Sequence, residues 1–176
     1  MGTPFGLVLS LLASLLIVGF IVAVVVRPDP EQQPSVDYLA AAEAAQSDVE
    51  VPLLAPELPE GWTANRAELV TGAADGVIRW EIGFLTPGDQ YIGFVQGVDA
   101  NPSWVSERVE GAASDDERSI GGIRWSVYDR RDVDDPGNTA FALVGEAGAS
   151  TLVLAGTAED PEFEVLASAL SEEAQQ

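Results

Sequence analysis

A continuous apolar run, Phe5 to Val26, constrains this chain more than any other stretch. It contains no charged residue and no proline. At the helical rise of about 1.5 Å per residue, a helix over this run is roughly 33 Å long, enough for a bilayer core of about 30 Å. Lipid offers the backbone no hydrogen-bond partners, so a spanning segment has to be helical. The sequence therefore predicts a transmembrane helix over residues 5–26, after a short N-terminus of residues 1–4.

A cleaved signal peptide is the main alternative for this run. Such a peptide has a shorter apolar core, with positive charge before it and a small-x-small cleavage site close behind. Here no Lys or Arg precedes the run, and Arg27 and Pro28 follow it, so an uncleaved anchor fits better. Within the run, Gly19 and Ala23 form a small-xxx-small pair through which two such helices can approach.

The orientation of the anchor stays open on the residues alone. Arg27 weakly favours the cytoplasmic side for the residues that follow the run. The same residues carry the whole formal charge of −21, and so strongly acidic a body is repelled by an anionic cytoplasmic leaflet. We therefore expect the body to lie outside the cytoplasm.

The composition also excludes several classes of function. The chain has no Lys and only eight Arg among 29 carboxylates, whereas nucleic-acid binding needs cations that neutralise phosphates. It has no Cys and no His, which excludes disulfides, zinc thiolate sites and Ser-His-Asp catalysis. The missing Lys excludes Schiff-base chemistry. Carboxylates, hydroxyls and Arg remain for any chemistry, and no cofactor is expected.

The body after the run divides into a stalk with an Ala-rich helix, residues 27–50, and a domain, residues 51–174. The stalk is rich in proline, and Ser35 is expected to cap the helix that follows it. Further along, a period of two predicts strands and a period of 3.6 predicts helices. Strands are expected over residues 62–70, 77–85, 90–98, 118–120, 123–130, 139–145 and 150–157. Asn101 and Asp160, each followed by a proline, are expected to cap two further helices.

This order of elements predicts an α+β fold with a mostly antiparallel, meandering sheet flanked by helices. The arrangement is loosely similar to the Mog1/PsbP-like architecture. On one predicted strand, Ile78, Trp80, Ile82 and Phe84 share a face. Gly121 and Gly122 supply the positive φ angles of a tight hairpin turn.

Several phrases together resemble one known family. They are LPEGW at 58–62, WEIGFLTPGDQYIGFVQ at 80–96, Trp104, GGIRWSVY at 121–128, LVLAGTA at 152–158 and the last helix. In combination they resemble an actinobacterial family of single-span membrane proteins, domain of unknown function 4245. The resemblance implies a short cytoplasmic N-terminus, one span and a body in the cell envelope, and it implies no catalytic or binding residue. Such proteins commonly carry basic residues before the span, which this chain lacks.

Two groups of side chains are candidates for a site. Calcium is bound by six to eight oxygens, and the loop carboxylates Asp129, Asp132, Asp134 and Asp135 are the best metal candidates. Their spacing is not that of an EF-hand, and Arg130 and Arg131 partly neutralise them, so a solvated loop is the favoured interpretation. The acidic run at 115–117 is a weaker candidate. The four tryptophans, Trp62, Trp80, Trp104 and Trp125, are candidates for a platform on which carbohydrate or peptide stacks. Core packing is the favoured interpretation for Trp80, on an alternating strand, and for Trp104, on an apolar helix face.

The sequence thus predicts a membrane-anchored, extracytoplasmic module that binds a partner and is not an enzyme. The expected partners are the bilayer, through residues 5–26, and a protein of the membrane or envelope. The alternative is a carboxylate-dependent or calcium-dependent cell-wall hydrolase, which needs two positioned carboxylates in a cleft. No catalytic residue is assigned.

Overall fold

The structure is a computed structural model that describes residues 14–15 and 35–176. Residues 35–176 belong to one compact unit. Apart from residues 14 and 15, the predicted span at 5–26 lies outside the described residues, and so do Gly19 and Ala23. Within the described part of the chain, no helix is both long enough and apolar enough to cross a bilayer.

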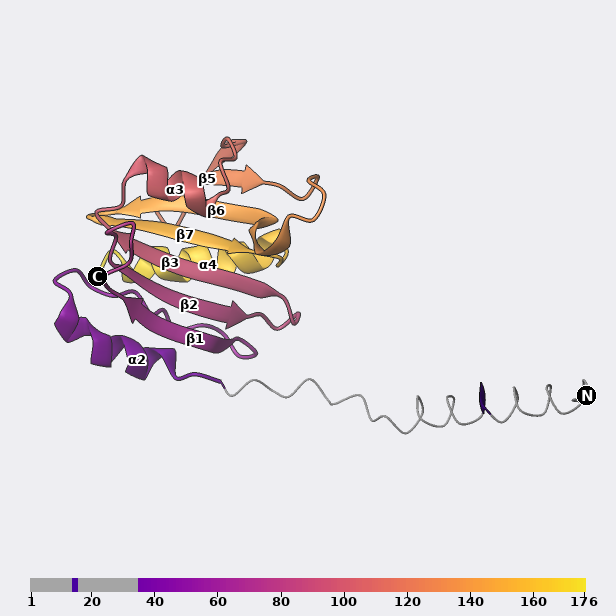
Figure 1. Cartoon of the computed structure of the whole chain (residues 1–176). Coiled ribbons are helices and arrows are strands. Elements are labelled where there is room, and N and C mark those ends of the chain that lie inside the picture. Colours follow the sequence, from indigo (N-terminus) through magenta and orange to yellow (C-terminus); the bar gives the residue numbers. More distant parts are fainter. Residues whose placement is uncertain (1–13, 16–34) are drawn as a thin grey trace, which may run out of the picture. The chain divides into compact units, whose positions relative to one another are not determined.

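A seven-stranded antiparallel sheet forms the centre of the domain (Figure 1). Its strands lie in the spatial order β1-β2-β3-β7-β6-β5-β4. In chain order they are β1 (Thr63–Val70), β2 (Arg79–Leu85), β3 (Tyr91–Val98), β4 (Asp116–Ile120), β5 (Ile123–Asp129), β6 (Phe141–Ala147) and β7 (Ser150–Gly156). The sheet is therefore two meanders, β1 to β3 and β4 to β7, that join where β3 pairs with β7.

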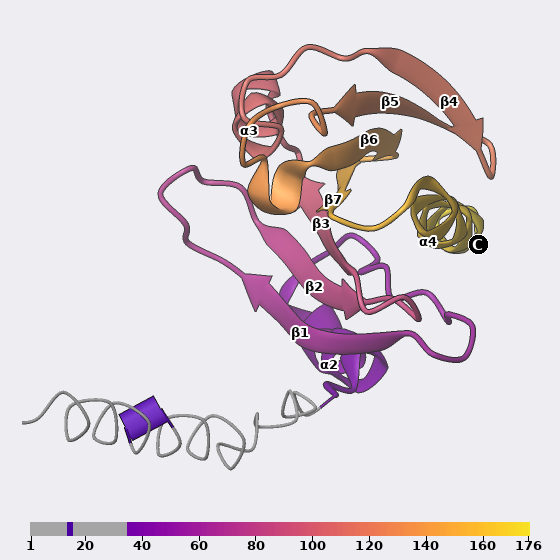
Figure 2. The same ribbon diagram turned by 90° about the vertical axis from the view of Figure 1, so that its right-hand side faces the viewer.

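Three α-helices accompany the sheet: α2 (Tyr38–Ala45), α3 (Pro102–Arg108) and α4 (Asp160–Glu173). Short 3-10 turns occur at Gln46–Asp48 and Gly137–Thr139. Figure 2 shows α3 and α4 on opposite faces of the sheet. The predicted α+β class and the predicted order of helices and strands are confirmed.

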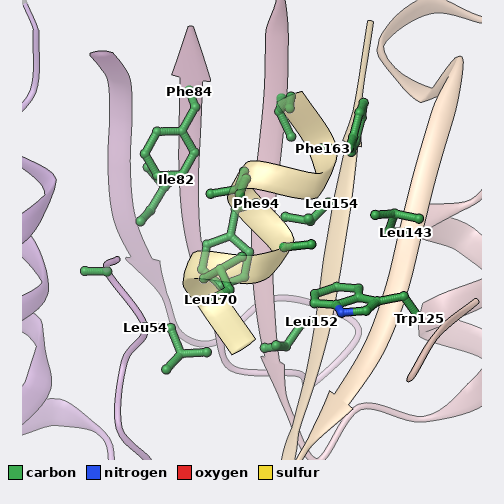
Figure 3. Close-up of a cluster of buried hydrophobic side chains, with 14 of the residues drawn as sticks. Leu54, Ile82, Phe84, Phe94, Trp125, Leu143, Leu152, Leu154, Phe163 and Leu170 are labelled. Atoms are coloured by element: carbon green, nitrogen blue, oxygen red, sulfur yellow. The ribbon is translucent and has the colours of Figure 1, made fainter. Parts of the chain in front are cut away.

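The face of the sheet under α4 holds the main core (Figure 3). Alternate residues of the strands point to this face, as a period of two requires, and the apolar stripe of α4 covers them. Its largest members are at most 1% exposed. They are Trp80, Ile82, Phe84, Ile92, Phe94, Trp125, Phe141, Leu143, Leu152, Leu154, Phe163, Leu166 and Leu170.

The opposite face, called here the α3 face, carries a smaller apolar cluster. Helix α3 covers only part of this face, and Trp104 packs beneath it, 2% exposed. The other buried members are Val77, Val109, Ala142, Val144 and Val153. Partly buried apolar side chains, among them Val95 and Ala155, pack around this cluster.

Local signals explain most element ends, with two corrections. Asn101 caps α3, because its side chain accepts a hydrogen bond from the Trp104 amide at 2.9 Å. The expected cap Ser35 is wrong: Asp37 caps α2 through the Ala40 amide. Asp160 is the first residue of α4, and Glu159 precedes it as the cap, in a capping box with Glu162. Ser, Asp and Glu side chains can all accept a hydrogen bond from an amide at the start of a helix. Where several of these residues lie close together, the sequence does not show which one is the cap.

Helix α2 and the Pro-rich segment after it pack against the sheet, although the predicted domain boundary at residue 51 leaves α2 outside the domain. The Tyr38 ring lies edge-on to Phe84, with centroids 5.2 Å apart, and Ala42 is buried. The carbonyl of Leu54 accepts a hydrogen bond from Trp80 Nε1 at 3.0 Å. The segment therefore serves as part of the cover of the main core.

Two buried tryptophans provide a test of this contact. Trp80 and Trp125 are both at most 1% exposed, but only Trp80 Nε1 has a hydrogen-bond partner. Trp80→Phe should lose about 1–3 kcal/mol more free energy of unfolding than Trp125→Phe, because it leaves the Leu54 carbonyl buried without a donor. Urea denaturation followed by circular dichroism measures both variants. Equal losses would show that the hydrogen bond does not stabilise the fold.

Candidate functional site

The acidic loop does not bring its carboxylates together. Asp129 ends β5 and pairs with Arg131, whose hydrogen bonds hold the pKa of the Asp129 carboxyl below its usual value. Asp132, Asp134 and Asp135 lie exposed in the turn beyond it. Among residues 14–15 and 35–176, no three acidic side chains are grouped so that they could hold a metal ion. The calcium hypothesis therefore gains no support from the geometry of the described residues.

Arg131 instead fastens this loop to α4. Its guanidinium lies 2.8 Å from Asp160, which also accepts from Arg118 at 2.9 Å. Both guanidinium groups lie against the Phe141 ring, at 5.6 Å for Arg118 and 4.8 Å for Arg131. In the weaker acidic run, Asp115 accepts a hydrogen bond from the Asp129 amide at 2.8 Å. The ion pairs of Arg118 and Arg131 with Asp160 thus connect β4 and the loop after β5 to the start of α4.

The tryptophans do not form an exposed platform. Trp80, Trp104 and Trp125 are at most 2% exposed. Trp62 is half-buried and lies edge-on to Phe84, with centroids 6.2 Å apart. All four pack against the core clusters, so the stacking-platform hypothesis is wrong.

A buried carboxylate on the α3 face is fully paired. Glu81, 9% exposed, lies 2.6 Å from Arg79, 2.8 Å from Arg66 and 3.9 Å from Arg108. Three cations around one carboxylate offset the cost of burying its charge. Arg108 also lies over the Trp104 ring at 4.9 Å, and burial lowers its pKa. The carboxylate and the three guanidinium groups of this cluster are thus paired with one another, which makes them poor candidates for binding a ligand.

An open groove lies beside it on the α3 face, between α3 and strands β5 and β6, and we call it the α3–β5 groove. Its volume is ≈ 740 Å³. The wall formed by α3 and its flanking residues consists of Ala100, Pro102, Val105, Ser106, Val109 and Ala112. The floor formed by the sheet consists of Arg124, Ser126, Tyr128, Val144, Gly145 and Glu146. The groove is thus apolar along the helix and mixed along the strands.

Arg124 is the distinctive group in this groove. Every other arginine in residues 35–176 has a carboxylate within 4.0 Å, but Arg124 has none. Glu146 lines the same groove, yet its carboxylate accepts a hydrogen bond from the Thr151 hydroxyl at 3.1 Å. In a chain of net charge −21, an arginine without an ion pair is a ready binding group for an external carboxylate.

Sequence reasoning missed this groove, although its floor has a simple signal. Ile123, Trp125 and Val127 alternate with Arg124, Ser126 and Tyr128 along β5, so the second set must point to the other face. The pattern predicts a polar row on that face. It does not reveal that α3 stands across from this row, because α3 reaches its place through tertiary packing.

The chemistry of the groove suits binding. Its side chains that can carry charge are Arg124, Tyr128 and Glu146, and the chain has no Cys or His to act as a nucleophile or base beside them. Apolar walls with a few oriented polar groups are typical of recognition surfaces.

A family model described as "Protein of unknown function (DUF4245)" matches residues 2–170. No curated protein matches the chain, and no solved structure does.

Proposed function

This chain belongs to the DUF4245 family, and we propose that it is a non-enzymatic, membrane-anchored binding module of the cell envelope. The anchor in this proposal is the apolar run at residues 5–26, with the domain on the extracytoplasmic side. The binding surface is the α3–β5 groove. The order of strands and helices in the sequence loosely resembles the Mog1/PsbP-like architecture, which is compatible with an accessory role, but a fold alone does not determine function.

Arg124 is the observation that carries the proposal. It lies exposed in a groove whose opposite wall is apolar, and it has no carboxylate within 4.0 Å among the described residues. A ligand that matches both features has a carboxylate next to apolar side chains. An open groove of ≈ 740 Å³ suits a short protein segment better than an enclosed small molecule.

The net charge restricts the partner further. A body of charge −21 repels acidic proteins at long range. The partner is therefore neutral or basic overall, and it presents one carboxylate, from a side chain or a chain terminus, where the segment docks onto Arg124. Such local complementarity sets the register of an interface more than its total affinity.

In-cell photocrosslinking tests this function. A photoreactive amino acid at Ser106, on the exposed rim of the groove, should give one discrete adduct with a protein. The same amino acid at Glu164, exposed on α4 on the opposite face, should give none. Arg124→Ala should lower the yield of the Ser106 adduct about tenfold, the equivalent of 1.4 kcal/mol.

A second arginine serves as the matched control. Arg66 is half-exposed but ion-paired with Glu68 and Glu81, so Arg66→Ala should leave the adduct unchanged. Equal yields from positions 106 and 164, or an adduct that is insensitive to Arg124→Ala, would overturn the proposed binding surface.

The alternative, a carboxylate-dependent or calcium-dependent hydrolase, finds less support. Glycoside hydrolysis uses two carboxylates that flank one bond, and the groove contains one, Glu146. We therefore propose binding in preference to catalysis.

A further inference from the structure

A second cavity lies on the α4 side of the sheet, at the C-terminal end of α4. Its volume is ≈ 260 Å³, and it is bounded by the segment after α2, the turn between β6 and β7, and α4. Val51, Leu54 and Ala147 give it apolar walls, and Gln96, Ser150 and Glu173 give it polar ones. A cavity of this size is below that of most ligand pockets, so it holds a small group.

Gln96 fixes one wall of this cavity. The residue is 1% exposed, and its amide oxygen accepts from the Leu54 amide at 2.9 Å. Its amide nitrogen donates to the Pro52 carbonyl at 2.7 Å and to Ser150 Oγ at 2.9 Å. The side chain therefore holds the strand, the segment and the turn at fixed positions and is itself satisfied.

Glu173 is not satisfied. Its Oε1 atom accepts a hydrogen bond from the Ala55 amide at 3.1 Å. Its Oε2 atom is buried and has no hydrogen-bond partner among the described residues. Burial raises the pKa of the Glu173 carboxyl, and the single hydrogen bond from Ala55 lowers it by less. An acceptor that is buried without a donor costs free energy, so this oxygen retains the capacity to accept a hydrogen bond.

The domain itself has no cation to offer. The chain has no Lys and no His. Six of the arginines in residues 35–176 are bound to other carboxylates, and Arg124 lines the other groove. A metal ion would need about six oxygen ligands, whereas half of the walls named here are aliphatic. The matching donor is therefore organic.

We propose that this cavity binds an aliphatic primary ammonium group, with the Glu173 carboxylate and Ser150 Oγ as its acceptors and its carbon chain against Val51, Leu54 and Ala147. The net charge of −21 raises the local concentration of such cations. The ammonium can belong to a small amine or to the lysine side chain of another protein. This site is separate from the α3–β5 groove, and neither proposal depends on the other.

Binding to the purified full-length chain in detergent micelles tests the proposal, with n-pentylamine as the probe and 1-pentanol as its uncharged analogue. Calorimetry should show saturable binding of pentylamine at least tenfold tighter than that of pentanol. Glu173→Gln keeps an acceptor for the Ala55 amide but removes the charge, and it should weaken pentylamine binding at least tenfold. The matched control Glu172→Gln alters the exposed neighbour on the same helix and should bind as the wild type does.

Two further arms complete the experiment. Ala147→Leu narrows the cavity without altering Glu173, and it should also abolish binding, which keeps the test valid if Glu173→Gln folds poorly. Nα-acetyl-lysine methylamide should bind as tightly as pentylamine if the natural source is a protein, and much more weakly if it is a small amine; either result supports the ammonium site. Equal binding of pentylamine and pentanol, or undiminished binding to Glu173→Gln, would overturn it.

Discussion

Replacing Phe163 by alanine should lower the free energy of unfolding by about 3–5 kcal/mol. Phe163 lies in the first turn of α4 and is fully buried. Its ring meets Phe141 edge-on, with centroids 4.9 Å apart, and it packs between α4 and the strands (Figure 3). Alanine leaves a cavity that this close-packed layer cannot fill. Urea denaturation monitored by tryptophan fluorescence measures the loss.

Val165 on the same helix is the matched control. It is 40% exposed, so Val165→Ala removes few contacts and should change the free energy of unfolding by no more than about 0.5 kcal/mol. If both variants lost a similar amount, α4 would not be packed on the sheet through the Phe163 side of the helix.

Gly156→Ala should lower the free energy of unfolding by about 3 kcal/mol. A Cβ atom on Gly156 would overlap the carbonyl oxygen of Tyr91 and would lie 2.9 Å from Ile92 Cα. Both atoms belong to the backbone of the paired strand β3. No side-chain rotation relieves such a contact, so β3 and β7 would have to move apart. The reduced midpoint of urea unfolding reports the effect, with the m-value expected to stay constant.

Gly93, on the strand paired with β7, provides the comparison. A Cβ there meets the Tyr91 side chain, with the nearest contact to Oη at 3.0 Å. That side chain can rotate away on the partly open α3 face, so Gly93→Ala should cost about 1 kcal/mol or less. Two glycine variants of equal stability would contradict the close backbone approach at position 156.

The class and order of the elements could be predicted because each depends on local signals. Alternation along Arg79–Leu85 places Trp80 and Phe84 on the face of the main core and Glu81 on the other face. The adjacent glycines Gly121 and Gly122, which adopt positive φ angles, allow the hairpin to be predicted from sequence. The packing of α2 could not be predicted in this way. An Ala-rich helix has no strong apolar stripe, and its contact with Phe84 depends on Tyr38.

The candidate sites were harder to predict, since composition suggests groups but does not place them. The acidic loop is a cluster of carboxylates in sequence and therefore suggests a metal site, yet in the structure Asp129 pairs with Arg131. The sequence around Arg124 does not distinguish it from the other arginines. It became a candidate because, in the part of the chain that the structure describes, no carboxylate lies within 4.0 Å of it. Likewise, Glu173 meets the Ala55 amide only in the folded structure, because the two residues are far apart in the chain. The sequence therefore does not show which oxygen of this carboxylate has a hydrogen-bond partner.

The junction of the two meanders has a consequence for how the chain folds. Within each meander, neighbouring strands are close in sequence, but β3 and β7 are distant and enclose all of β4 to β6. Closing so long a loop costs chain entropy before any contact compensates for it, so this pairing should form late. Until then, a chain exposes two unpaired strands in the middle of its future sheet. Two molecules at that stage can each complete the other's sheet, and exchange of a meander through the α3 connection is therefore the route by which this domain would form an intertwined dimer.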